Sequence, residues 1–122
     1  MKSEKRNDSI LTDKSLTFAV RIVKLNQYLT YTKHEFVISK QIIRSGTSIG
    51  ANICEANYAQ SKSDFISKLH IALKETAETE YWIRLLFLSA LIDEKLSSSL
   101  LDDCLDIKHL LIASLSTAKG TK

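Results

Sequence analysis

The sequence of 122 residues contains no proline, and its 3 glycines all come after residue 45. Proline and glycine supply most of the tight turns that sandwiches and barrels require. A chain with so few of these residues favours a small number of long helices joined by short links. The length is that of one domain, because domains typically contain about 100–150 residues.

The composition is that of a globular protein, with 44% apolar and 25% charged residues. Residues 1–14 are polar and lack the apolar segment of a secretory signal. The longest strongly apolar stretch, residues 82–92, is far shorter than the roughly 20 residues that span a bilayer. We therefore expect a cytoplasmic protein that does not contact membranes. In a reducing compartment, Cys54 and Cys104 are interpreted as buried thiols.

Apolar residues at helical spacing predict four helices, over about residues 12–32, 35–58, 64–91 and 97–117. Four helices of this length with short links predict an all-α, antiparallel up-down-up-down four-helix bundle. The bundle is expected to occupy residues 11–117, between polar tails at 1–10 and 118–122. A cap at Ser61 or Ser63 is expected for the third helix.

The first helix carries a clear apolar stripe that is expected to face the core. Its members follow the spacing of one helical face, and three neighbours are expected to widen it. The stripe is Phe18, Ile22, Leu25 and Leu29, and the neighbours are Leu16, Ala19 and Val23.

The second helix contains the weakest local signal, because Gly46 and Gly50 lie among Ser and Thr residues. Each glycine costs about 1 kcal/mol in a helix, so this stretch would normally indicate a loop. The apolar spacing nevertheless continues across it, through Ile42, Ile49 and Ile53. The two glycines also share a face. The pattern therefore predicts a continuous helix with a close contact to another helix at both glycines.

No motif for catalysis is present in the sequence. It contains no Glu-x-x-His, P-loop, G-x-G-x-x-G or G-x-S-x-G pattern. The nearest approach to a metal site is an acidic cluster that we interpret as a solvated flank. Its members are Glu75, Glu78 and Glu80, with Asp106 and His109 on the last helix. We therefore expect no enzyme, no catalytic residue, no cofactor and no metal.

Polar residues spaced by three or four follow the second helix beside its apolar stripe. They are Arg44, Ser48, Asn52 and Glu55. Such a row could form a hydrogen-bonded ladder with a cation at one end and a carboxylate at the other. Partly buried, the ladder would fix helix register or a subunit contact. Exposed, its arginine could meet a phosphate.

The stretch 44–56, RSGTSIGANICEA, resembles the signature of the 23S ribosomal RNA intervening-sequence protein family, approximately R-A-x-x-S-I-x-x-N-I-A-E-G. The stretch 61–72 is similar to the family's S-x-x-x-F-x-x-x-L-x-I-A segment. Ala56 replaces the last glycine of the signature, and Asn57 is expected to supply a left-handed residue there. The matching positions are Arg44, Ser48, Ile49, Asn52, Ile53, Glu55, Phe65, Leu69, Ala72 and Glu78.

The resemblance implies an antiparallel four-helix bundle that assembles as a ring-like homopentamer. The family's biochemical role is not established. A related branch, the accessory variability proteins of diversity-generating retroelements, pairs with a reverse transcriptase and binds nucleic acid through a basic surface.

Charge is unevenly divided along the chain, whose net charge is +3. Residues 1–44 hold nine Lys/Arg and four Asp/Glu (+5), whereas residues 45–122 hold eight and ten (−2). This division and the resemblance favour a non-enzymatic, oligomeric bundle that binds nucleic acid, with RNA favoured. The alternative is a protein-interaction scaffold or accessory subunit without nucleic-acid contact. The sequence contains no aromatic-stacking motif of the kind that binds RNA, which favours this alternative. The candidate phosphate contacts are Lys14, Arg21, Lys24, Lys40, Lys62 and Lys68.

Overall fold

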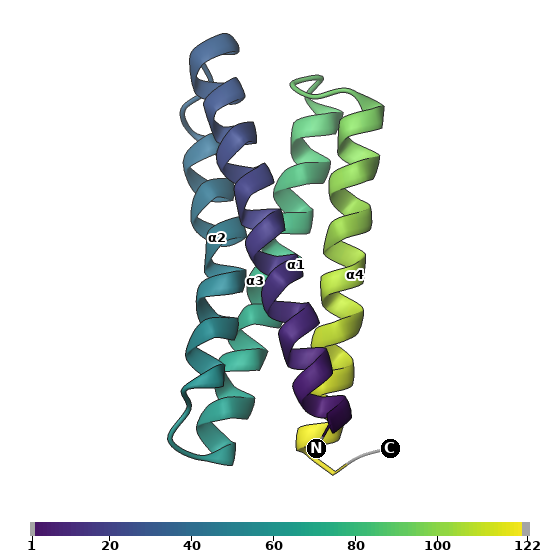
Figure 1. Cartoon of the computed structure of the whole chain (residues 1–122). Coiled ribbons are helices and arrows are strands. Elements are labelled where there is room, and N and C mark those ends of the chain that lie inside the picture. Colours follow the sequence, from purple (N-terminus) through teal and green to yellow (C-terminus); the bar gives the residue numbers. More distant parts are fainter. Residues whose placement is uncertain (1, 121–122) are drawn as a thin grey trace.

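The computed structural model describes the backbone of residues 2–120 and the side chains of residues 9–120. Within this range the chain forms four α-helices, one π-helical turn (η1) and no strand. Consecutive helices run antiparallel, and α1 and α4 also pack side by side (Figure 1). This confirms the predicted four-helix bundle. The elements are α1 (Lys2–Gln27), η1 (Tyr28–Thr32), α2 (Ile38–Asn57), α3 (Lys62–Leu88) and α4 (Glu94–Ala118).

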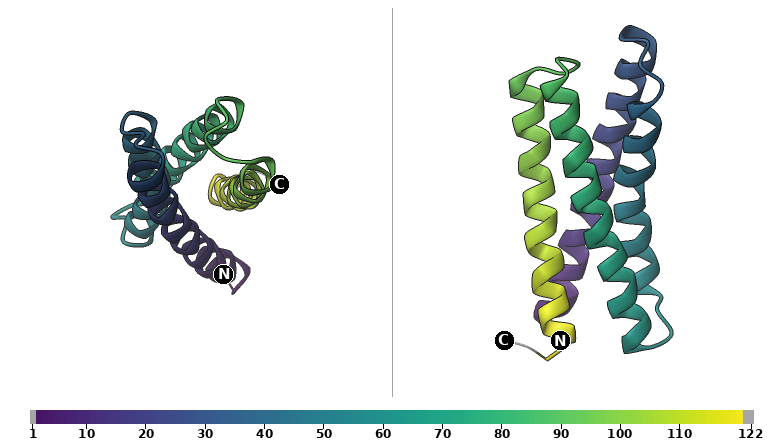
Figure 2. Two further views of the ribbon diagram at one scale, coloured as in Figure 1. Left: turned by 90° about the horizontal axis from the view of Figure 1, so that it is seen from above. Right: turned by 180° about the vertical axis from the view of Figure 1, so that it is seen from behind.

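The bundle is closed unevenly, because α1 packs extensively on α2 but only sparsely on α4. Figures 1 and 2 show α1 crossing the bundle obliquely, so that its C-terminal end lies over α2 and diverges from α4. The link between α1 and α2 therefore stands apart from the link between α3 and α4 at the same end of the bundle.

The core contains the predicted stripe of α1, since Phe18, Ile22, Leu25 and Leu29 are all buried. The predicted widening of that stripe is wrong for Leu16 and Val23, which are 65% and 39% exposed. At 100° per residue, these side chains fall on the side of α1 opposite the core, where they are exposed to solvent.

The second helix is continuous through both glycines, as predicted. A β-carbon built on Gly46 would lie 2.8 Å from Cγ1 and Cγ2 of Ile22. One on Gly50 would lie 3.3 Å from Oγ of Ser15. The two glycines therefore mark the close approach of α2 to α1 that the spacing predicted.

Side-chain caps set three helix starts. Ser61 accepts a hydrogen bond from the Asp64 N–H at 3.0 Å and caps α3, as predicted. Asp93 caps α4 by accepting from the Leu96 N–H at 2.8 Å, so α4 begins at Glu94 rather than near residue 97. Glu35, expected to begin the second helix, instead caps the first turn of α2, which begins at Ile38.

The start of α1 differs most from the prediction, because its backbone is helical from Lys2 rather than from about residue 12. Residues 2–10 contain no proline or glycine, so nothing in them stops a helix that the buried Leu11 anchors to the core. The predicted N-terminal tail at 1–10 is therefore largely helical backbone. At the other end, α4 ends at Ala118, and residues 121–122 lie outside the described part.

All three links between the helices reverse the chain without glycine. Ala90 has φ 61°, and the hydrogen bonds Ala90 N–H to Phe87 O and Leu91 N–H to Leu86 O complete a Schellman motif after α3. The expectation for Asn57 is wrong, because it does not have positive φ. Its amide instead donates to Oγ1 of Thr12 at 3.2 Å, which ties the end of α2 to α1.

The two cysteines occupy different environments, although both were expected to be buried. Cys104 is buried in the core, whereas Cys54 is exposed, one position beyond the buried stripe of α2. Both thiols are free. Burial, with the nearby carboxylates of Glu80 and Asp103, raises the pKa of the Cys104 thiol to about 12. Across the described residues, no helix is long and apolar enough to cross a membrane.

Candidate nucleic-acid interface

The six cations predicted to contact phosphate divide into two groups. Three of them form ion pairs within the chain: Lys14 with Asp106 at 3.8 Å, Arg21 with Asp103 at 2.6 Å, and Lys68 with Glu55 at 3.0 Å. The other three have exposed side chains with no ion pair to any described residue. They are Lys24, Lys40 and Lys62.

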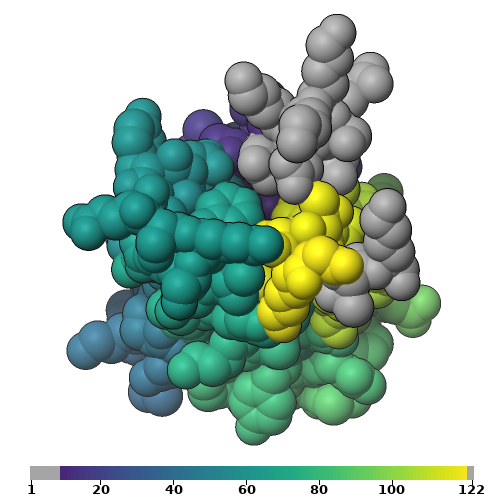
Figure 3. Space-filling view, turned by 90° about the horizontal axis from the view of Figure 1, so that it is seen from below, coloured from purple at the N-terminus to yellow at the C-terminus, as the bar shows by residue number. Residues whose placement is uncertain are grey.

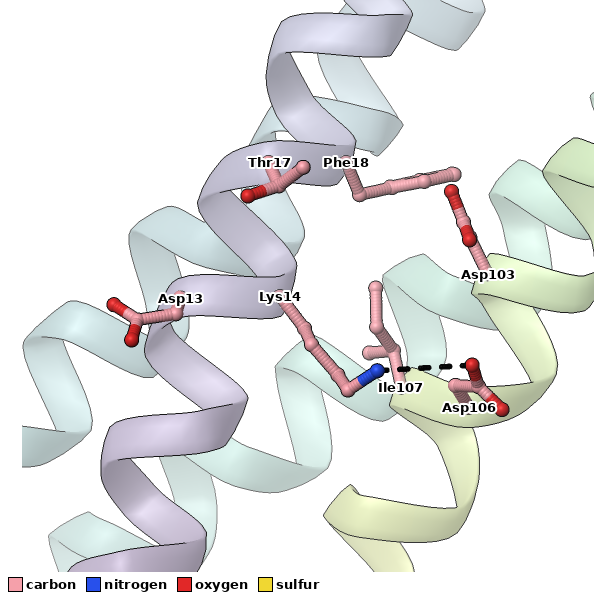
Figure 4. Close-up of a pocket in the computed structure, with 7 residues that line it drawn as sticks. All are labelled: Asp13, Lys14, Thr17, Phe18, Asp103, Asp106 and Ile107. Carbon is pink, nitrogen blue, oxygen red and sulfur yellow. Dashed lines mark ion pairs between the residues drawn. The ribbon is translucent and has the colours of Figure 1, made fainter.

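The paired cations stabilise contacts between helices. Arg21 reaches from α1 to α4, where it binds Asp103 and also donates to Oγ of Ser99 at 3.0 Å. Figure 4 shows Lys14 extending across the same seam toward Asp106. These two pairs use cations of the basic half of the chain to neutralise carboxylates of the acidic half. They are therefore poor candidates for phosphate contact.

The same seam contains an open pocket of about 210 Å³. Phe18 and Ile107 form its apolar part, and Asp13, Lys14, Thr17, Asp103 and Asp106 also line it. In Figure 4 Lys14 and Phe18 point across the seam, whereas Asp13 points away from it. Because Asp106 and Asp103 already bind Lys14 and Arg21, the pocket is a gap between α1 and α4 whose inward charges are largely satisfied.

The unpaired lysines lie at opposite ends of the bundle. Lys24 is in the last turn of α1 and Lys40 is near the start of α2, where the Asn26 amide donates to the Ser39 carbonyl at 3.0 Å. Lys62 begins α3 at the other end, which Figure 3 views from below. The structure therefore brings Lys24 and Lys40 to one end and excludes Lys62 from it.

The end that holds Lys24 and Lys40 also carries residues that the sequence analysis missed. Lys33 and His34 are exposed in the α1–α2 link, and Nζ of Lys33 lies 5.9 Å from the centroid of the Tyr28 ring. Three aromatic side chains on this link are exposed: Tyr28 (39%), Tyr31 (78%) and Phe36 (62%). Their spacing matches no motif, and the signal that could have found them was the concentration of aromatic and basic residues in 24–40.

Glu35 is the only acidic residue of this stretch, and its carboxylate is occupied. Its oxygens accept hydrogen bonds from the backbone N–H groups of Val37, Ile38 and Ser39, at 3.1, 2.9 and 2.8 Å. Partial burial alone would raise the pKa of the Glu35 carboxyl, but these N–H groups lower it below its ordinary value. The carboxylate is thus charged and held by the N-terminus of α2 rather than by a lysine.

The polar row of α2 does not form the expected ladder of side chains. Oγ of Ser48 donates to the Arg44 carbonyl and the Asn52 amide donates to the Ser48 carbonyl, so both bonds end on the helix backbone. Glu55 pairs with Lys68 of α3. The correction has a simple cause: Ser and Asn side chains on a helix reach the carbonyl four residues earlier more easily than another side chain.

Arg44 connects α2 to α3. Its guanidinium binds Glu75 at 3.2 Å and also Glu78, which in turn accepts from Nε1 of Trp82 at 3.1 Å. The Trp82 hydrogen bond is the main cause that lowers the pKa of Glu78, and Arg44 adds to it. The acidic cluster interpreted above as a solvated flank therefore holds an arginine, and Glu80 pairs separately with Lys108 at 3.3 Å. Within the described residues, no three His, Cys, Asp or Glu side chains converge for a metal.

The remaining signature positions are apolar and lie along α2 and α3. Ile49, Ile53, Leu69 and Ala72 are buried, and Phe65 packs against the core. All ten signature positions therefore lie in α2 or α3, the two helices that pack most closely, and none of them lies in the basic α1–α2 link.

The comparisons with known proteins agree with this architecture. A family model described as "23S rRNA-intervening sequence protein" matches residues 7–113. A solved structure from Bacteroides thetaiotaomicron, described as a protein with unknown function from the S23 ribosomal protein family, is 54% identical, with a TM-score of 0.89. The alignment covers 90% of this chain and 98% of that one. No match was found among curated proteins.

Proposed function

Because this chain belongs to the 23S rRNA-intervening sequence protein family, we propose that it is a non-enzymatic, oligomeric module that binds nucleic acid, with RNA as its ligand. The observation that carries the proposal is the unpaired positive charge at the α1–α2 end. Lys24, Lys33 and Lys40 have no ion pair to a described residue, and Glu35, the one acidic residue of the stretch 24–40, is held by backbone N–H groups.

This charge is placed where it can act on a ligand outside the chain. The cations of the α1–α4 and α2–α3 contacts are satisfied by carboxylates, so they contribute little field beyond the surface. Unpaired lysines on an exposed end can instead neutralise the phosphates of a nucleic acid and release the counterions condensed on its backbone. A net charge of +3 on one chain is modest, but an oligomer would repeat the patch in each subunit.

The test is fluorescence anisotropy of a labelled, structured RNA with the wild-type protein at several salt concentrations. Three phosphate contacts give a log-log slope of about −2 to −3, so affinity should fall more than about tenfold between roughly 50 and 200 mM salt. Lys24→Ala/Lys40→Ala should flatten the slope, whereas Lys62→Ala at the opposite end is the matched control. No binding of the wild-type protein at low salt would overturn the proposal.

A second candidate function, an assembly or protein-interaction scaffold, is supported by the outer face of α1. Leu16, Val20 and Val23 follow one helical face and are 65%, 49% and 39% exposed. A contiguous apolar stripe directed away from the core is typical of a surface that another protein covers. We propose that a second copy of this chain covers it, in a homopentameric ring of the kind that the family resemblance implies.

The two candidates make separate demands. The scaffold needs assembly but no RNA, so light scattering of the purified protein tests its premise directly. A monomer at micromolar concentration would count against it and would leave the RNA measurement to decide the first proposal.

A further inference from the structure

We propose that the α1–α2 end of the bundle binds unpaired nucleotides, whose bases stack on Tyr31 and Phe36 while lysines hold the flanking phosphates. This inference rests on the proposed nucleic-acid binding and deepens it, because it specifies the site and the single-stranded form of the ligand.

The first support is the exposure of the aromatic rings. Tyr31 and Phe36 are 78% and 62% exposed, on either side of the chain reversal, and neither ring packs against another described aromatic ring. Removing such rings from water is favourable, so a bare aromatic surface of this kind favours a partner with flat apolar faces. Nucleobases provide such faces whatever their sequence.

The second support is the charge around these rings. Lys24 lies four residues before Tyr28, so helical spacing places these two side chains on the same side of the α1 end. Lys33 lies over the ring of Tyr28, with Nζ 5.9 Å from its centroid. Lys40 lies exposed in the first turn of α2. Aromatic rings interleaved with unpaired cations can contact alternating bases and phosphates of one strand.

The third support is the backbone that presents them. The π-helical turn η1 is closed by Lys33 N–H to Tyr28 O at 3.2 Å and Glu35 N–H to Leu29 O at 2.8 Å. His34 takes φ 55°, a conformation that costs energy in residues other than glycine. These hydrogen bonds and the fully buried Leu29 fix the backbone of the link, and the Tyr31 and Phe36 side chains are exposed on it.

The surroundings leave this end open to a ligand. Figure 2 shows the α1–α2 link set apart from the α3–α4 link, which carries the carboxylates of Asp93 and Glu94. Asp93 is occupied as the cap of α4. An approaching polyanion at the α1–α2 link therefore meets lysines, aromatic rings and the hydrogen-bonded Glu35 before it meets the carboxylates of the α3–α4 link.

Unpaired nucleotides fit this surface better than a duplex does. In a duplex the bases are stacked on one another, so their faces are not available to protein rings. A site that consisted only of lysines would bind both forms through phosphate. Dependence on the rings is therefore the property that separates this proposal from general electrostatic binding.

The experiment measures anisotropy of a fluorescein-labelled oligouridylate of about 12 nucleotides and of a blunt RNA duplex of the same length, with four variants. Tyr31→Ala and Phe36→Ala should each weaken single-strand binding about fivefold or more and change duplex binding less than about twofold. Tyr31→Phe should keep wild-type affinity, because the ring is retained. Tyr58→Ala is the matched control, since Tyr58 is 88% exposed at the opposite end of the bundle.

The failures of the two proposals are distinguishable. If the wild type binds RNA but Tyr31→Ala and Phe36→Ala bind the single strand equally well, this inference is wrong and the proposed function stands. If the wild type binds neither RNA, the proposed function itself fails. Two parallel measurements address other partners: a change of mass on Tyr31→Ala in light scattering, or sedimentation of the wild type with phosphatidylglycerol vesicles without oligouridylate binding, would each overturn the inference.

Discussion

Gly46 of α2 faces Ile22 of α1 so closely that a β-carbon on Gly46 would lie 2.8 Å from both Cγ1 and Cγ2 of Ile22. Ile22 is fully buried, and its Cβ would itself be only 3.2 Å away. These atoms are close to the α1 backbone, so they cannot withdraw unless the helix moves. The separation of α1 and α2 at this level is therefore one that requires glycine at residue 46.

We predict that Gly46→Ala destabilises the protein. Overpacking of a filled core costs about 1–3 kcal/mol, and the better helix propensity of alanine returns up to about 1 kcal/mol of that. Urea unfolding followed by circular dichroism measures the difference in the free energy of unfolding. A Gly46→Ala protein as stable as the wild type would show that the contact can relax.

Two variants make this test specific. In Gly50→Ala the new β-carbon would lie 3.3 Å from Oγ, 3.5 Å from Cβ and 3.6 Å from the carbonyl carbon of Ser15. This milder crowding and the gain in helix propensity should nearly cancel, so stability should change by less than about 0.5 kcal/mol. In the double variant Gly46→Ala/Ile22→Ala the two 2.8 Å contacts with Cγ1 and Cγ2 are removed, so the two effects should be non-additive by more than about 0.5 kcal/mol.

The bundle and this glycine contact could be predicted from the sequence because both depend on spacing within one helix. The apolar spacing continues across Gly46 and Gly50, so the residues before and after the glycines bury the same face of α2. Helix ends were less predictable, because a residue near a helix start can belong to its first turn or cap it from outside. Glu35, a good helix former, caps α2 from outside, and Asp93, a preferred cap residue, starts α4 before its apolar stripe begins. The choice between these depends on the path of the whole link, which local propensity does not contain.

A second prediction concerns the contact of Arg44 with Glu75 and Glu78. Arg44→Ala should lower the free energy of unfolding by about 1 kcal/mol, since the side chain is partly exposed and its ion pairs are partly screened. Arg44→Lys should recover only part of the loss, because one ammonium cannot span both carboxylates as a guanidinium does. Lys62→Ala, which removes an exposed lysine without an ion pair, is the control and should have little effect.

The same contact predicts a dependence on pH. The pKa of Glu78 is lowered below its ordinary value of 4.5, chiefly by the Trp82 hydrogen bond, so its ionised form stabilises the folded state. That contribution is complete above pH 4.5 and is lost as pH falls through the lowered pKa of the folded state. Glu78→Gln should therefore be less stable than the wild type at neutral pH, and the difference should shrink in acid. A difference that stays constant down to about pH 3 would contradict this account.

A third prediction uses the link after α3. Ala90 holds φ 61° in the Schellman motif, where a side chain is unfavourable. Ala90→Gly should therefore stabilise the protein by about 1 kcal/mol, measured by urea or thermal unfolding. Ala113→Gly, in the exposed interior of α4, is the matched control and should destabilise by about the same amount. Loss of stability in both variants would rule out strain at Ala90.

A fourth prediction concerns the two thiols. Cys104 is buried and the pKa of its thiol is raised to about 12, whereas Cys54 is exposed. A disulfide reagent at about pH 8 should therefore modify one thiol per folded chain rapidly, since only an accessible thiolate reacts. The second thiol should react only at the rate of unfolding. Cys54→Ser should abolish the fast phase, and a fast phase that survives this substitution would contradict the assignment.

The candidate interface was harder to predict than the fold. Lysines that form ion pairs and lysines that do not look alike in a sequence, because the partners of Lys14, Arg21 and Lys68 come from other helices. The exposed aromatic rings at residues 28–36 gave no periodic signal, since they lie on a π-helical turn and a link. Their role depends on which side chains the reversal leaves uncovered.

The last prediction concerns the outer stripe of α1. Leu16 and Val23 were expected to be buried, but both are exposed in the single chain. If a second copy covers this stripe, Leu16→Lys/Val20→Lys should reduce the assembled mass in light scattering to that of one chain, because a charged side chain in an apolar contact is costly. The secondary structure should persist, since both positions are solvent-facing in the single bundle. Tyr58→Lys, a charge at a highly exposed site away from the stripe, should leave the assembly intact. A wild-type mass in the double variant would show that the oligomer, if formed, uses another face.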